Sequence, residues 1–108
     1  MADTLTGKGY AITNSNATAL SAGGSETITI IGCTIANKHA TDACWVSVTV
    51  NRTGGGVDTK LVNQISIPIN DSLDILQGKV VLNSNDALEM QAEADSKLDA
   101  SLSYLVQT

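Results

Sequence analysis

Apolar residues occur in short runs along the chain, and clusters of turn-forming residues separate these runs at nearly regular intervals. The rhythm is clearest from residue 65 to residue 107, where Asn, Asp, Ser and Gly divide the runs. Short runs bounded by turn residues are typical of β-strands, so the pattern predicts an all-β domain. The expected strands are 9–14, 17–20, 26–37, 43–52, 60–69, 73–76, 79–82, 87–92 and 98–106.

The run at residues 26–37 changes phase in its middle. Its isoleucines fall on even positions up to Ile30, whereas Ile31 and the apolar residues after it fall on odd positions. A slip of one residue beside Gly32 predicts a β-bulge, although burial of both faces of the strand would give the same pattern.

The run at residues 43–52 alternates cleanly, with Cys44 and three valines in one phase. We expect Val46, Val48 and Val50 to point into the core. Residues 38–42 have a length that suits a hairpin loop, which predicts that this strand pairs with the one before it. If Ile31 faces Val46, antiparallel counting places Cys33 opposite Cys44 and Ile35 opposite Asp42.

Two later segments contain residues that are unusual in a β-strand. Pro68 cannot donate a hydrogen bond within a sheet, so it confines that end of the strand at 60–69 to an edge or a turn. Residues 86–98 contain a plausible helix start, with Asp86 as the cap and Glu89 three residues later. Leu88, Met90 and Ala92 nevertheless alternate with polar residues, so we prefer a strand.

Length and composition agree with one β-rich domain. A chain of 108 residues buries roughly 65% of its unfolded surface, which allows a real core. The sequence has nine Ile, ten Leu and eight Val but no Phe, one Trp and two Tyr. Residues 1–8 are mostly small and polar, so we expect a flexible arm, or one that orders only against a neighbour, followed by a domain at 9–108.

The charge of −5 is concentrated near the end of the sequence. Residues 71–108 hold seven acidic residues and two lysines, whereas residues 1–70 hold four charges of each sign. Binding to nucleic acid depends on clustered Lys and Arg, so this distribution argues against a nucleic-acid partner. The chain begins without a secretion pattern and has no apolar run of membrane-spanning length, so we expect cytosolic synthesis and no membrane partner.

The residues that could carry chemistry do not form a recognisable motif. Cys33 and Cys44 have only His39 between them, which does not make a tetrahedral metal site. In a cytosolic protein we expect both cysteines to be reduced and buried, although the register above would also permit a disulfide. We expect His39 to be a solvated loop residue, since no Ser or Cys stands at the spacing of a known nucleophile motif.

Two pairs of acidic residues could be catalytic, but a structural explanation is simpler. Asp71 with Asp74, and Asp95 with Asp99, could act as general acid and base, but solvated turn acids are far commoner. We therefore predict no catalytic residue, no metal site and no cofactor.

Five residues are candidates for an interface. Trp45 is either a core residue on a second buried face or an exposed anchor, since Trp is enriched at interfaces. Three consecutive glycines at a strand end indicate either a flexible tip or close backbone contact with another chain. The candidates are Leu5, Trp45, Gly54, Gly55 and Gly56.

The chain resembles small virion structural proteins of tailed bacteriophages, particularly those that infect cyanobacteria and marine bacteria. The resemblance covers residues 26–108, and its motifs are apolar strand patterns and turns. It is carried by Thr29–Asn37, Val62–Pro68, Ser72–Leu76, Gly78–Leu82, Asp86–Leu88 and Ser103–Thr108.

The resemblance implies a non-enzymatic antiparallel β-sandwich, jelly-roll-like. From the strand pattern we expect the face of Val46, Val48 and Val50 to pack against the face of Leu102 and Tyr104 inside it. The resemblance further implies a capsid decoration (cement) protein on the outer surface of the virion, a homotrimer that bridges major capsid subunits. The alternative is a trimeric tail or fibre component that recognises the host surface. A carbohydrate-binding module is disfavoured because the chain has so few aromatic residues. The charge distribution suggests that the arm and the glycine loop dock while the acidic last third faces solvent.

Overall fold

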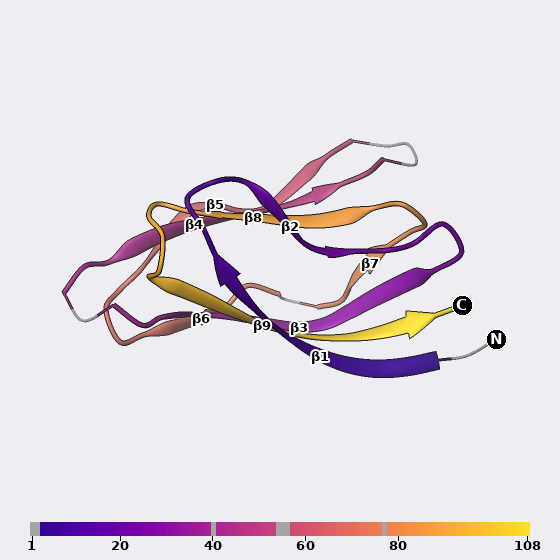
Figure 1. Cartoon of the computed structure of the whole chain (residues 1–108), viewed down its shortest axis with the longest axis horizontal. Coiled ribbons are helices and arrows are strands. Elements are labelled where there is room, and N and C mark those ends of the chain that lie inside the picture. Colours follow the sequence, from indigo (N-terminus) through magenta and orange to yellow (C-terminus); the bar gives the residue numbers. More distant parts are fainter. Residues whose placement is uncertain (1–2, 40, 54–56, 77) are drawn as a thin grey trace.

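The computed structural model describes residues 3–39, 41–53, 57–76 and 78–108. Within these ranges all regular structure is β-strand, as the sequence predicts (Figure 1). None of the described residues forms a helix long and apolar enough to cross a membrane. The strands are β1 Asp3–Ile12, β2 Ala17–Ser21, β3 Thr27–Asn37, β4 Cys44–Asn51, β5 Thr59–Ile67, β6 Ser72–Asp74, β7 Val80–Leu82, β8 Ala87–Ala92 and β9 Leu98–Gln107.

The strands form two antiparallel sheets that pack face to face. The first sheet has the order β1-β9-β3-β6, and β7 also pairs with β3. The second sheet has the order β2-β8-β4-β5. Since β6 and β7 pair with different parts of β3, they share one strand position, and the described residues fill eight positions, four in each sheet. This strand order is that of a jelly roll, so the predicted fold is confirmed.

The core lies between the two sheets. Val46, Val48 and Val50 from β4 are buried in the same apolar cluster as Leu102 and Tyr104 from β9. The two faces expected to pack together therefore do so. The largest fully buried side chains of the cluster are Ile12, Ile30, Ile35, Ile67, Leu82, Leu88, Met90, Leu98, Leu102, Val46, Val48 and Val50.

The predicted bulge in β3 is present. The pairing of β3 with β9 shifts register between Ile30 and Gly32. Ile30 and Cys33 are both buried, while Ile31 between them is 44% exposed. The extra residue thus returns the apolar side chains to the core face, and burial of both strand faces is not the explanation.

The predicted hairpin between β3 and β4 is wrong. In the first sheet β3 pairs with β6, β7 and β9, whereas β4 pairs with β5 and β8 in the second sheet. The connection between β3 and β4 therefore crosses from one sheet to the other. Cys33 and Cys44 are not paired across a ladder, and both are free and buried. Each strand has one apolar face, and the two faces meet across the core rather than side by side.

A buried asparagine fixes this crossing. The Asn37 side-chain amide donates hydrogen bonds to the carbonyl oxygens of Asp42 (3.0 Å) and Ile67 (2.9 Å). Its own oxygen accepts a hydrogen bond from the backbone nitrogen of His39 at 2.8 Å. One side chain thus ties the end of β3 to the connection and to the end of β5.

The boundary expected at residue 8 is also corrected. Residues 3–8 are the first part of β1, which pairs with β9 continuously from Asp3 opposite Gln107 to Ile12 opposite Leu98. The side of β1 that faces the second sheet carries Thr4, Thr6 and Lys8 before it reaches Tyr10 and Ile12. Backbone pairing, which leaves no apolar signal in the sequence, therefore orders these residues.

The segment that contains Asp86 and the segment that ends at Pro68 have the structure that we expect. Residues 87–92 form β8, and Asp86 is a buried partner of Arg52 rather than a helix cap. β5 is the edge strand of the second sheet, and it ends at Ile67, directly before Pro68.

Candidate functional site

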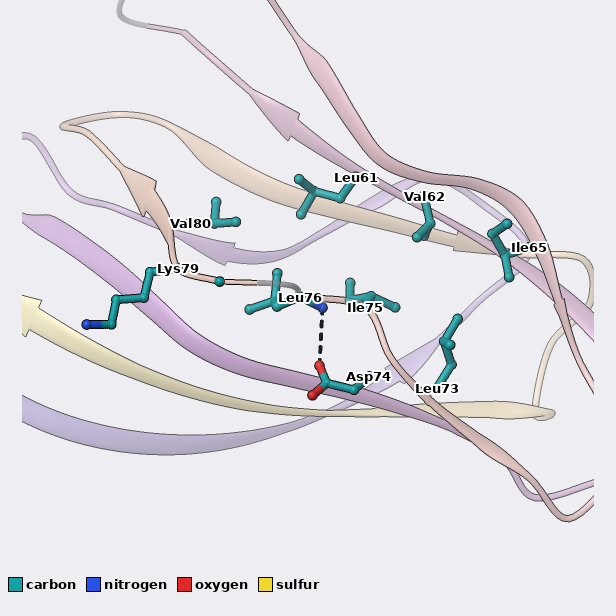
Figure 2. A pocket seen from close by; sticks show the side chains of 10 residues that line it. Leu61, Val62, Ile65, Leu73, Asp74, Ile75, Leu76, Lys79 and Val80 are labelled. Atoms are coloured by element: carbon teal, nitrogen blue, oxygen red, sulfur yellow. Dashed lines mark hydrogen bonds between the residues drawn. The ribbon is translucent and has the colours of Figure 1, made fainter.

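An apolar cleft of about 570 Å³ opens along one side of the sandwich. It lies where β5, the edge of the second sheet, faces the segment of β6 and β7 at the edge of the first (Figure 2). The wall from β5 carries Leu61, Val62 and Ile65. The facing wall carries Leu73, Ile75, Leu76 and Val80.

The cleft exists because both edges are irregular. β6 and β7 have three residues each, and between them the Ile75 backbone nitrogen donates a hydrogen bond to the Cys33 carbonyl oxygen of β3 (3.1 Å). On the other side, the pairing of β5 with β4 shifts register twice. Gln64 in β5 has a φ of 53°, and its backbone nitrogen donates to the Ser47 hydroxyl at 2.9 Å. The two edges therefore do not close over the apolar residues between them.

The lining favours an apolar ligand. Among the described residues around the cleft, Asp74 and Lys79 are the ionisable ones. The Asp74 carboxylate accepts a hydrogen bond from the backbone nitrogen of Leu76 at 3.1 Å. An engineered apolar cavity of about 150 Å³ holds one benzene ring, so this cleft has room for several aliphatic side chains. The other described residues of the lining are uncharged, so the cleft is suited to binding apolar groups.

The interface candidates lie elsewhere. Leu5 is 69% exposed on the outer face of the first sheet, opposite Leu105 of β9. Trp45 is partly buried on the outer face of the second sheet, and its backbone nitrogen donates to the Glu93 carboxylate at 3.3 Å. These two side chains are on opposite faces of the sandwich, and neither lines the cleft. Gly54, Gly55 and Gly56 lie outside the described residues.

The residues with nucleophilic or basic groups are engaged structurally. Burial, with a further contribution from the Asp74 carboxylate, raises the pKa of the Cys33 thiol to about 12, so it stays protonated at neutral pH. The His39 ring nitrogen Nδ1 accepts hydrogen bonds from the backbone nitrogens of Thr41 (3.3 Å) and Asp42 (3.1 Å). This bonding orders the crossing between the sheets.

The paired acids serve turns and surface ion pairs. Asp71 and Asp95 accept backbone hydrogen bonds, from Ser72 (2.8 Å) and Asn14 (2.7 Å). Asp99 forms an exposed ion pair with Lys38 at 3.2 Å. Within the described ranges no three His, Cys, Asp or Glu side chains are grouped so that they could hold a metal ion.

Sequence reasoning did not identify the cleft. Its one signal is that Leu61, Val62 and Ile65 occupy both phases of a predicted edge strand, which leaves apolar side chains without a place in the core. The buried ion pair between Arg52 and Asp86 gave no signal, because the two residues are far apart in the sequence.

Comparison with known proteins gives a match in structure alone. No family model matches the sequence, and no match was found among curated proteins. A chain in the structure of infectious bursal disease virus, Gx strain, is similar with a TM-score of 0.51 and 14% identity. The match covers 97% of this chain and 30% of that chain, so this protein spans less than a third of its neighbour's length.

A chain in the structure of the Gt strain of the same virus gives a TM-score of 0.48 with 8% identity, over 98% of this chain and 30% of that one. At such identities the likeness to the Gx-strain chain concerns the fold alone. This chain therefore shares the β-sandwich architecture of one part of a chain found in a virus structure.

Proposed function

We propose that the protein is a non-enzymatic virion structural protein of a bacteriophage, a decoration protein that binds the outer surface of the capsid and bridges major capsid subunits. The observation that carries the proposal is the strand order, in which one short chain builds a complete jelly roll. Jelly rolls are recurrent in viral capsid domains, and also in lectins and cupins. The likeness to part of a chain in a virus structure supports the first of these uses.

The aromatic residues argue against a lectin. Sugar faces stack on exposed aromatic rings, and this chain has three aromatic residues in all. Tyr104 is buried in the core, and Tyr10 packs against it. Trp45 is partly buried. No exposed aromatic platform is therefore available for a carbohydrate.

The outer face of the first sheet has the character of a docking face. Adjacent strands place four uncharged side chains in one row across this face, with Leu5 69% and Val81 41% exposed. Ile31 of the bulge follows on β3 and is also exposed. Interface cores are depleted in charged residues, so this row is suited to contact with a capsid subunit. The row consists of Leu5, Leu105, Thr29 and Val81.

The outer face of the second sheet has the opposite character. Glu89 lies there opposite Thr49, and Glu93 is exposed beside Trp45. We propose that this acidic face points to solvent. From the sequence we expected the first eight residues to dock as a separate arm. We now propose that the outer face of the first sheet docks instead.

Particles that lack the protein test the role. We expect them to assemble but to release their genome at a lower temperature, because a ligand that binds only the assembled shell stabilises it. Addition of purified protein should restore the release temperature. Particles that are equally robust but fail to adsorb to host cells would contradict the decoration role and favour a tail or fibre component.

Point variants test the docking face. Deletion of residues 2–8 is unsuitable, since it removes more than half of β1. We expect Leu5→Glu with Val81→Glu to abolish restoration, because both side chains are exposed in the uncharged row. The matched control is Glu89→Lys with Glu93→Lys on the opposite face, which should restore stability fully. The reverse result would contradict the assignment of the two faces.

A further inference from the structure

The four edges of the two sheets differ in how well they are protected. Unpaired strand edges are templates for association, and proteins protect them by shortness, irregularity or charge. β6 and β7 have three residues each, and β2 has five with a register shift. β5 is longer, but it has two register shifts and a residue with positive φ. Each of these three edges therefore carries a protective feature.

β1 is the exception. It has ten residues, pairs with β9 without a register shift, and is the outermost strand of its sheet (Figure 1). The Lys8 ammonium group does not protect the free edge, because it donates to the carbonyl oxygen of Ala19 in the second sheet at 2.6 Å. Gly7 and Gly9 have no side chains. A strand in the plane of the sheet can therefore approach β1 along its whole length.

We propose that β1 pairs antiparallel with β1 of a second copy of this chain, across a two-fold axis at Gly7. Side chains of directly paired residues share one face of a sheet, so the axis must pass through a residue rather than between two. An axis at Gly7 or at Lys8 gives the longest ladder, nine residues of each strand. The axis at Lys8 places like charges directly opposite each other, which is unfavourable.

The strand is complementary to itself in this register. Leu5, which is 69% exposed, lies opposite Gly9 of the second copy, where no side chain competes for the space. Lys8 lies opposite Thr6 of the second copy, so no like charges are directly paired. The contact is isologous and joins the two first sheets into one continuous sheet. It requires no capsid, and it is separate from the three-fold association that the resemblance implies, which stays a prediction.

Single cysteines test the register. At Gly7 an added Cβ meets its nearest neighbour, the Leu102 carbonyl oxygen, at 3.9 Å, and at Gly9 it meets nothing within 4 Å. Both variants should therefore fold. Two Gly7→Cys side chains would face each other directly at a Cβ separation of about 5 Å, which a disulfide can span after a small adjustment. Two Gly9→Cys residues would be about 13 Å apart along the ladder and could not bond.

We expect mild oxidation to crosslink Gly7→Cys into dimers at least about ten-fold more than the matched control Gly9→Cys. An equimolar mixture of Leu5→Cys and Gly9→Cys should give the mixed dimer. Sedimentation equilibrium of the unmodified chain should show masses that are even multiples of the monomer as concentration rises. Equal or absent crosslinking in the two variants, or a chain that stays monomeric or purely trimeric, would overturn the proposal.

Discussion

Arg52, which follows β4, is hydrogen-bonded to β7 and to Asp86 directly before β8, so its removal is a sharp test of the fold. Its Nη1 atom donates to the Asp86 carboxylate at 2.8 Å and to the Val81 carbonyl oxygen at 2.6 Å. Asp86 is 1% exposed, and the same carboxylate oxygen accepts a hydrogen bond from the Asn83 backbone nitrogen at 3.0 Å. Arg52→Met keeps most of the side-chain volume but leaves the Asp86 carboxylate without its cation.

The expected loss of stability in Arg52→Met follows from the burial of the Asp86 carboxylate. Removing one partner of a buried ion pair costs about 3–5 kcal/mol, because the other charge stays buried without the opposite charge. The Arg52 side chain is 27% exposed, so water reaches this pair and we expect a loss somewhat below that range, about 2–3 kcal/mol. Since the total stability of a domain is about 5–15 kcal/mol, the variant should melt about 10 °C or more below the parent chain.

Urea denaturation of four chains measures this cost. The parent chain is compared with Arg52→Met, with Arg52→Met combined with Asp86→Leu, and with Lys60→Met, which removes an exposed cation. We expect the double variant to lose less stability than Arg52→Met, because it removes the buried carboxylate together with its cation. Lys60→Met should stay within about 0.5 kcal/mol of the parent. Arg52→Met as stable as Lys60→Met would refute the reasoning.

Further predictions concern three buried residues, in the core and at the crossing between the sheets. Val48→Asp buries a charge in the core and should prevent soluble folding, whereas Thr49→Asp on the outer face should fold. Circular dichroism distinguishes a folded from an unfolded variant. A folded Val48→Asp would mean that the core face is assigned wrongly. Asn37→Leu leaves buried backbone groups unpaired and should cost about 2–3 kcal/mol in urea unfolding, with less than about 0.5 kcal/mol contradicting the role of Asn37. Cys33, with a pKa of about 12 against 9.0, should react with a thiolate-specific reagent about a thousand-fold more slowly at pH 8 in the native than in the unfolded chain, and equal rates would exclude its burial. Because the unfolded thiol ionises first, Cys33 should also lower stability as pH rises from about 9 to 12.

Local features of the fold could be predicted from the sequence because each depends on a few neighbouring residues. The change of phase beside Gly32 predicted the bulge in β3. Alternation over residues 87–92 predicted a strand despite a composition typical of helices. Pro68 predicted an edge or a turn at that end of the strand, since it cannot donate to a neighbour, and β5 is an edge strand that ends directly before it.

The pairing of strands could not be predicted in the same way. An alternating strand such as β4 carries the same pattern whether its neighbour is across a hairpin or across the core, and residues 38–42 are long enough for either. The bonds of Asn37 that decide between them join residues up to 30 positions apart. The cleft was missed for a related reason, because it arises from irregular edges of two different sheets.

The location of the protein in intact particles tests the central proposal most directly. Electron microscopy of purified virions, with a label on the acidic face at Glu93, measures where the protein is and how many copies each particle carries. We expect hundreds of copies on the outside of the capsid, each a two-sheet sandwich with the label directed to solvent and the row of Leu5 and Val81 against the shell. A few copies confined to the tail, or none in the particle, would contradict the proposed function.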